Sequence, residues 1–264
     1  MKIVRFVTPD NHVGIGRLTR PGAAQPLLGS LFDQPRFADT EVSIARLLPP
    51  IEPPNIFCIG RNYRAHAAET GSALPEKPMV FMKPTTALAA PDEPIVIPAA
   101  APGEVDFEAE LAIVIGRRAR RVSEAEALDY VFGYTCANDV SARDCQRSDK
   151  QWARAKGFDT FCPLGPWVVT ADELDPDACL VRSRLNGQVM QSASTSEMVH
   201  SCRALVSYLS QAFTLLPGTL ILTGTPEGVG MARTPPVFLR PGDRIEVEIE
   251  GVGVLSNPVV SDAA

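Results

Sequence analysis

Hydrophobic and polar residues alternate along several short stretches of the chain, a pattern typical of β-strands whose two faces differ. The clearest stretch, residues 105–115, reads VDFEAELAIVI. Its odd-numbered positions are hydrophobic, whereas Asp106, Glu108 and Glu110 fall on the other face. A second alternation covers residues 244–249. Both stretches are therefore predicted to be strands with one hydrophobic face.

The remaining patterns predict more short strands and few helices. Further strands are expected over residues 3–7, 13–15 and 132–139. Asn186 and Gly187 lie between two short runs and predict a two-residue hairpin turn. The S-x-x-E spacing at residues 123–126 predicts a helix that runs toward Tyr130. Hydrophobic residues at helical spacing predict another helix over residues 202–213.

A proline-rich stretch divides the chain. Four of the six residues at 49–54 are proline, which excludes a helix and favours an extended linker. We place the domain boundary there, with a small N-terminal β-rich domain and linker over residues 1–52 and a larger domain over residues 53–264. Strands and helices do not alternate regularly, so we expect a mainly β fold with some α-helix and mixed, largely antiparallel sheets.

Composition and charge exclude several classes of partner. The net charge of −6 argues against a nucleic-acid surface, which needs clustered Lys and Arg. No apolar run approaches the roughly 20 residues that span a bilayer, so we expect no membrane partner. The start of the chain turns polar too early for a signal peptide, and the six cysteines contain no CxxC pair. We therefore expect a cytoplasmic protein with reduced thiols.

Two neighbouring carboxylates suggest a metal site. Glu108 and Glu110 project from the same face of their predicted strand, where two like charges repel unless a cation neutralises them. Asp139, at the end of the next predicted strand, is a candidate third oxygen ligand. Three carboxylates without Cys or His suit Mg²⁺, Mn²⁺ or Ca²⁺ rather than zinc. The same alternation also fits a solvated sheet face, as expected for Glu246, and periodicity alone does not decide.

A histidine and a glutamate are candidates for proton transfer. His66 and Glu69 lie three residues apart in NYRAHAAE, a stretch that we predict to be a short helix. At this spacing the carboxylate can orient the imidazole, and such a pair can take a proton from water. An ordinary surface pair on a helix gives the same pattern.

Further polar residues could bind a small acid. Arg143 and Gln146 would share one helical face, where a guanidinium and an amide can hold a carboxylate and a keto oxygen. Lys156 could neutralise an enolate oxygen, with the hydroxyl of Thr160 nearby. The Gly-rich loop around Thr225 matches neither nucleotide-binding pattern, although its hydroxyls and backbone amides could bind an anion.

Eight segments, in order, resemble the fumarylacetoacetate hydrolase family. They are GRNYRAHAAE (60–69), PMVFMKPTTAL (78–88), VDFEAELAIVIG (105–116), GYTCANDVSARDCQ (133–146), AKGFDTFCPLGP (155–166), RLNGQVMQ (184–191), LLPGTLILTGTPEGVG (215–230) and LRPGDRIEVEIEGVGVLSNPV (239–259). The resemblance covers nearly all of the larger predicted domain. It implies a mixed β-sandwich roll and, usually, a homodimer.

The resemblance also implies roles for the candidate residues. Glu108, Glu110 and Asp139 would bind Mg²⁺ or Mn²⁺, and His66 with Glu69 would form a proton-transfer dyad on a mobile lid. The other implied positions lie around the substrate: Lys156 near the substrate oxygens, Thr160 near the metal shell, and Arg143, Gln146 and Thr225 along the site for the acid.

These roles imply chemistry on a small 2-oxo acid. We expect a hydrolase that cleaves a C–C bond of a 1,3-dioxo acid such as an acylpyruvate, through a metal-stabilised enolate, with water activated by His66 and Glu69. An isomerase of a hydroxymuconate-type acid and a decarboxylase of oxaloacetate would use the same residues. A metal-binding protein without activity is a further alternative.

Overall fold

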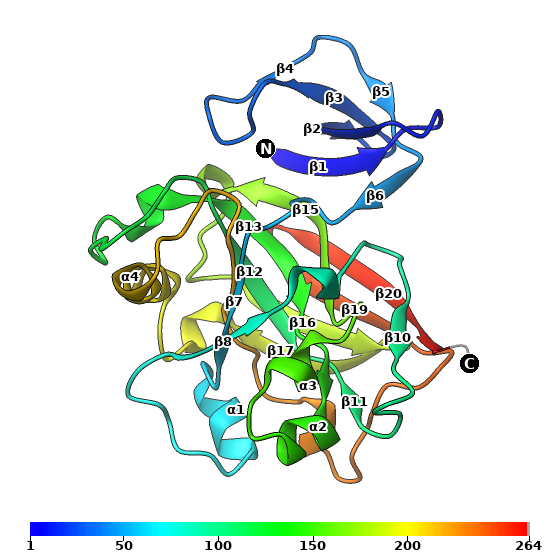
Figure 1. The fold of residues 1–264 in the computed structure, drawn as a ribbon, viewed down its shortest axis with the longest axis vertical. Coiled ribbons are helices and arrows are strands. Elements are labelled where there is room, and N and C mark those ends of the chain that lie inside the picture. The colour runs from blue at the N-terminus through cyan, green and yellow to red at the C-terminus, as the bar shows by residue number, and fades with distance from the viewer. Residues whose placement is uncertain (263–264) are drawn as a thin grey trace.

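Short β-strands dominate the chain, as the alternating pattern predicts, in the computed structural model, which describes residues 1–262. The first six strands form a unit at one end of the molecule (Figure 1). They are β1 (Lys2–Val7), β2 (Val13–Arg20), β3 (Ala23–Leu28), β4 (Arg36–Phe37), β5 (Val42–Ser43) and β6 (Arg46–Leu48). The proline-rich residues 49–55 that follow contain no helix or strand.

A large mixed sheet of thirteen strands runs through the molecule and includes these six. The other seven are β7 (Ile56–Gly60), β8 (Met79–Lys83), β9 (Leu88–Ala89), β12 (Ala109–Ile115), β13 (Val131–Asn138), β15 (Cys162–Thr170) and β18 (Leu220–Leu222). β1 pairs with β15, opposite Val168 and Val169, and Ile3 is fully buried in the core of the larger part. The N-terminal unit is thus continuous with the main sheet, and the boundary at residue 52 stays a prediction.

A second sheet packs against the first. Its five strands are β10 (Ile95–Ile97), β16 (Leu180–Leu185), β17 (Gln188–Ser194), β19 (Arg244–Ile249) and β20 (Gly253–Ser261). Leu111 and Ile113 of β12 share one buried cluster with Val247 and Ile249 of β19, so the two sheets form a sandwich around a common core. The architecture is mainly β, as the alternating pattern predicts, and it is the sandwich that the family resemblance implies.

Short helices lie around the sheets. The α-helices are α1 (Arg64–Glu69), α2 (Arg143–Ser148), α3 (Ala153–Gly157) and α4 (Cys202–Ala212), and the 3₁₀-helices are η1 (Thr85–Ala87), η2 (Ala127–Tyr130), η3 (Ala171–Glu173), η4 (Thr195–Glu197) and η5 (Gly230–Ala232). α1, α2 and α3 gather at the end of the molecule away from the N-terminal unit (Figure 1). None of the helices within residues 1–262 is long and apolar enough to cross a bilayer.

The predicted strand over residues 105–115 is interrupted, which corrects the expectation of one continuous strand. Its first part, β11 (Val105–Asp106), pairs with β14 (Ser141–Ala142) in a small separate sheet, and β12 begins only at Ala109. Phe107 is buried in a different hydrophobic cluster from Leu111, because the chain passes here from one packing layer to another.

Other predictions are confirmed or adjusted by local geometry. Asn186 and Gly187 both have positive φ, 51° and 81°, as the tight hairpin between β16 and β17 requires. The helix predicted from residue 123 is only the short η2, and no side chain caps it, because the Ser123 hydroxyl donates to the Glu126 carboxylate instead. All six cysteines are free and buried.

Candidate active site

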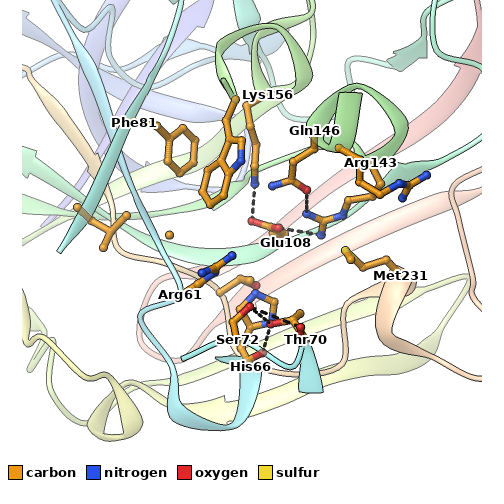
Figure 2. Close-up of a pocket in the computed structure, with 15 residues that line it drawn as sticks. Arg61, His66, Thr70, Ser72, Phe81, Glu108, Arg143, Gln146, Lys156 and Met231 are labelled. Atoms are coloured by element: carbon orange, nitrogen blue, oxygen red, sulfur yellow. Dashed lines mark hydrogen bonds and ion pairs between the residues drawn. The ribbon is translucent and has the colours of Figure 1, made fainter. Parts of the chain in front are cut away.

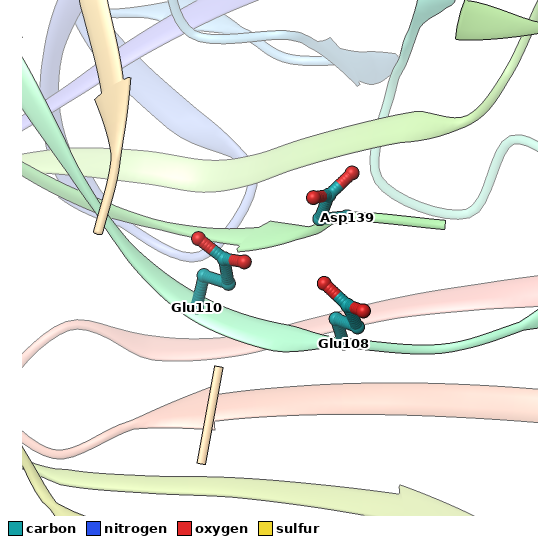
Figure 3. Close-up of side chains that lie close together, drawn as sticks. All are labelled: Glu108, Glu110 and Asp139. Atoms are coloured by element: carbon teal, nitrogen blue, oxygen red, sulfur yellow. The ribbon is translucent and has the colours of Figure 1, made fainter. Parts of the chain in front are cut away.

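Three carboxylates converge where β12 and β13 run antiparallel. Glu108 directly precedes β12, Glu110 lies within it, and Asp139 directly follows β13. The backbone N–H of Asp139 donates to the carbonyl oxygen of Glu108 at 2.9 Å, which fixes the two strand ends side by side. Oxygen atoms of the three carboxylates lie within 4.8 Å of one another (Figure 3). The sequence-predicted triad is therefore assembled in space.

The carboxylates are buried rather than solvated. Glu108, Glu110 and Asp139 are 6%, 1% and 0% exposed, which excludes a solvent-facing sheet surface. Further along the same face of β12, Ala112 and Val114 are fully buried as well. Both faces of this strand are covered, so the polar residues at its start are enclosed by protein.

Two buried lysines neutralise part of this charge. Lys156 Nζ lies 2.7 Å from Glu108 Oε2 and 2.7 Å from Asp139 Oδ2. Lys83 Nζ donates to Asp139 Oδ1 and to the carbonyl oxygen of Val140. Both ammonium groups are almost completely buried, so these are ion pairs shielded from solvent.

The carboxyl groups differ in how far nearby cations neutralise their negative charge. Burial opposes ionisation of Glu108, but Lys156 and Arg143 outweigh it and hold its pKa well below the usual range. For Glu110, burial and then the negative charges of Asp139 and Glu108 raise the pKa well above its usual value. Glu110 accepts a hydrogen bond from Gly224 N at 2.6 Å and has no ion pair among residues 1–262. Glu110 is thus the ligand most in need of a cation.

The donor set fits a hard divalent cation. The buried acids are Asp106, Glu108, Glu110 and Asp139, and the buried cations beside them are Lys83, Lys156 and Arg143. With every group ionised, four negative charges face three positive ones, so one negative charge lacks a partner. Three converging carboxylates are the oxygen ligands that Mg²⁺, Mn²⁺ or Ca²⁺ prefer, and the excess of one negative charge favours a bound cation.

Arg143 at the start of α2 links the triad to Gln146. Its Nε donates to Asp106 Oδ2 at 2.9 Å, and its Nη2 lies 2.8 Å from Glu108 Oε1. Its Nη1 donates to Gln146 Oε1 at 3.0 Å. Asp106, to which the sequence analysis gave no role, also accepts from the backbone of Gly230 and Met231. Asp106 therefore positions both Arg143 and the start of η5.

His66 and Glu69 form the predicted contact on α1. His66 Nδ1 lies 2.7 Å from Glu69 Oε1. The other carboxylate oxygen of Glu69 accepts from Gly228 N at 2.9 Å, so the Gly-rich loop fixes the glutamate from the opposite side. His66 is only 7% exposed, so the two residues are not an ordinary pair on the surface of a helix.

One cavity of about 260 Å³ is lined by Glu108, Lys156, Arg143, Gln146 and His66. This volume lies just below the roughly 300–1,000 Å³ of small-molecule sites, which suits a short acid. Figure 2 shows Lys156, Gln146 and Arg143 on one side of Glu108, and Arg61, His66, Thr70 and Ser72 on the other. The lining includes Thr225, Arg147, Phe81, Trp152 and Met231, but neither Glu110 nor Asp139.

Two threonines with predicted roles occupy different places. Thr225 lines the cavity, and its hydroxyl donates to Ala109 O at 3.0 Å and accepts from Gln191 Nε2 at 2.7 Å. Thr160 Oγ1 accepts from Val96 N at 2.9 Å, and Thr160 does not line the cavity. The structure brings Thr225 to the site and leaves Thr160 outside the cavity.

Sequence reasoning passed over Asp106 and Lys83. Asp106 falls on the same face of the predicted strand as Glu108 and Glu110, so the alternation that singled out the two glutamates also contained it. Lys83 ends an apolar strand, where a buried lysine implies an acidic partner. Its partner, Asp139, lies 56 residues further along the chain, and no spacing rule connects the two.

Substituting alanine for Gly228 is expected to disturb the histidine–glutamate pair from a distance. Gly228 has φ of +97°, and a Cβ there would lie 2.3 Å from the carbonyl oxygen of Met190. The loop must shift, at a cost of about 1–3 kcal/mol, and the amide that holds Glu69 moves with it. We expect a lower unfolding temperature and, in any reaction that uses the His66–Glu69 pair, a fall in kcat. Gly187→Ala, at another positive-φ glycine outside the cavity, should lower stability alone.

Comparisons with known proteins agree with this geometry. Residues 55–260 match the family model for the fumarylacetoacetate (FAA) hydrolase C-terminal domain. Oxaloacetate tautomerase fahd2, mitochondrial, from Xenopus laevis is 47% identical over 221 residues, which cover 83% of this chain and 69% of the relative.

Two solved structures show the same fold. That of 2-hydroxyhepta-2,4-diene-1,7-dioate isomerase from Mycobacterium marinum is 45% identical, with a TM-score of 0.87 and full coverage of both chains. That of maleylpyruvate hydrolase from Sphingobium sp. SYK-6 is 30% identical, with a TM-score of 0.79 over 99% of this chain and 100% of the other. From its sequence, its fold and its acidic cluster, the chain belongs to the fumarylacetoacetate hydrolase family of enzymes.

Proposed function

We propose that the protein is a divalent-metal-dependent tautomerase or isomerase of small 2-oxo acids. The observation that carries this proposal is that His66, with Nδ1 2.7 Å from Glu69, lines the same cavity as Glu108 of the carboxylate triad. A tautomerase or isomerase needs one group that removes a proton and returns it elsewhere, beside a site that stabilises an enolate. The named tautomerase and isomerase relatives support this choice.

Glu108, Glu110 and Asp139 would hold the ion, for which we propose Mg²⁺ or Mn²⁺. When bound, such an ion would supply Lewis acidity to the acid head of the substrate. Its positive charge would also neutralise part of the negative charge of Glu108 and Asp139, with which Lys156 forms ion pairs. Lys156 Nζ would then be available for a substrate oxygen, which is the role we propose for it.

His66 would move the proton. Because Glu69 holds Nδ1, the other ring nitrogen, Nε2, is the atom that can accept a proton from carbon and return it. The Gly228 amide keeps Glu69 oriented, so the ring position is fixed through two contacts. Arg143, Gln146 and Thr225 would bind the acid from the cavity wall, with Arg143 itself held by Asp106.

Hydrolysis, which the sequence analysis favoured, is the second candidate. The same His66–Glu69 pair could activate water for attack on a 1,3-dioxo acid, and the maleylpyruvate hydrolase relative supports it. Decarboxylation of oxaloacetate would need no attacking water. The homodimer, the cytoplasmic location and Thr160 beside the metal shell stay predictions.

An assay with a substrate panel separates these reactions. The purified protein with Mg²⁺ or Mn²⁺ is incubated with oxaloacetate, acylpyruvates and hydroxymuconate-type acids, and ultraviolet absorbance and products are recorded. A tautomerase changes the enol absorbance without fragments or CO₂, whereas a hydrolase releases two acids and a decarboxylase releases CO₂. Fragments or CO₂ as the main products would refute the proposal in favour of the matching alternative. No turnover of any acid would refute it altogether.

A further inference from the structure

Four cationic side chains line the cavity, and one of them has no partner. Lys156 and Arg143 are held by buried carboxylates, and Arg147 pairs with Glu104 at 2.7 Å. The guanidinium of Arg61 makes no hydrogen bond or ion pair with any side chain or backbone group of residues 1–262. Arg61 is therefore the cation in the cavity that remains available for an anionic ligand.

The backbone holds Arg61 in an unusual conformation. Its φ of 57° lies in the left-handed region, where glycine is relaxed and a residue with a Cβ is not. The neighbouring Asn62 fixes this turn, because its amide donates to His200 O at 3.0 Å and to Thr223 O at 2.7 Å and accepts from His200 N at 2.9 Å. A strained backbone carrying a long cationic side chain into a cavity points to a binding role.

Arg61 lies opposite the cations that face the triad. Figure 2 shows its guanidinium directed into the space between Glu108 and His66, while Lys156 and Arg143 approach Glu108 from the other side. The hydroxyl-bearing residues Thr70 and Ser72 line the cavity beside His66. The cavity thus has cationic groups on two opposite sides of Glu108, an arrangement suited to a molecule with two anionic groups.

We propose that Arg61 binds the carboxylate at the end of the substrate farther from the metal site, and so selects 2-oxo dicarboxylic acids over monocarboxylic ones. The position of the 2-oxo acid head rests on the proposed function. A guanidinium can hold a carboxylate through two parallel hydrogen bonds, which favours this anion over a neutral tail. Arg61 would determine specificity, whereas His66 would carry the chemistry.

Two unreactive probes test the proposal without turnover. N-oxalylglycine carries an oxalyl head and a distal carboxylate, and N-methyloxamate carries the same head with a methyl group instead. Both are titrated by calorimetry into the wild-type protein with saturating Mg²⁺, and into Arg61→Gln, Arg61→Lys, Arg64→Gln and Arg147→Gln. Arg64 is the matched control, since it is exposed on α1 and does not line the cavity.

The wild type should prefer N-oxalylglycine, and Arg61→Gln should weaken its binding by about 10–100-fold while leaving N-methyloxamate unchanged. Arg61→Lys should recover part of the preference, and Arg64→Gln should keep all of it. Equal weakening of both probes, loss of the preference through Arg147→Gln instead, or no preference in the wild type would each overturn the assignment. Circular dichroism confirms that the variants are folded.

The outcomes separate this assignment from the proposed reaction. A probe preference that depends on Arg61, together with no turnover of any 2-oxo acid, would refute the proposed function and leave the carboxylate subsite standing. Turnover of a 2-oxo acid without such a preference would support the proposed function and refute the carboxylate subsite.

Discussion

His66→Ala is expected to lower kcat on the preferred 2-oxo acid by about 10²–10⁴-fold, the usual contribution of a general acid–base group. The reason is that His66 lines the cavity and its ring is oriented by Glu69, while the ring makes no hydrogen bond or ion pair with Glu110 or Asp139. Affinity for Mn²⁺, measured by calorimetry, should stay close to that of the wild type. Glu69→Gln should give a smaller fall in kcat, because the ring remains but loses its charged partner.

The chain offers a matched control for this experiment. His12 and Asp10 also lie 2.7 Å apart, but their side chains are 80% and 70% exposed in the N-terminal unit. His12→Ala should therefore leave kcat unchanged. A parallel loss of metal affinity in His66→Ala would show that this residue supports the metal site rather than proton transfer, and an unchanged kcat would remove it from the mechanism.

Glu110→Gln should separate metal binding from folding. The change removes one of three carboxylate ligands, and we expect the affinity for Mn²⁺ to fall by at least about 100-fold, more than the roughly 10–100-fold seen when only a supporting residue is changed. Without metal, the variant should unfold at a higher temperature than the wild type. Burial and the charges of Asp139 and Glu108 disfavour the Glu110 carboxylate, and a neutral amide can still accept from Gly224 N.

Calorimetry with Mn²⁺ and thermal unfolding in the presence and absence of metal check both parts. Glu246→Gln is the control, because Glu246 also alternates with hydrophobic residues on a strand but is half-buried and belongs to no carboxylate cluster within residues 1–262. Its metal affinity should match the wild type. Wild-type affinity in Glu110→Gln would mean that the ion is held elsewhere.

Local patterns predicted local structure well. The alternation over residues 244–249 matches β19, and the Asn-Gly pair lies at the hairpin. The three-residue spacing of His66 and Glu69 does bring the two side chains into contact. In each case the interacting groups are near in sequence, so strand or helix geometry alone relates them.

Burial and contacts between distant residues could not be predicted from local patterns in the sequence. Periodicity left open whether Glu108 faces solvent, because the covering segments come from distant parts of the chain. The family motifs indicated that Glu108 is a metal ligand, but they did so through resemblance to other proteins and not through geometry. Arg61 carried no local signal, and Lys83 had only its place at the end of an apolar strand. In the structure, Arg61 is marked by its backbone conformation and its lack of a partner, and Lys83 by an aspartate far along the sequence.

The hydrogen bond between Gly228 and Glu69 has a consequence for folding kinetics. It joins residues 159 positions apart, whereas β12 and β13, which position the carboxylates, are consecutive strands of the large sheet. Contacts between distant residues form late, since closing a long loop costs more chain entropy. During refolding, the strands that carry the carboxylates should therefore pair before the histidine is oriented, and catalytic competence should be among the last properties that the chain acquires.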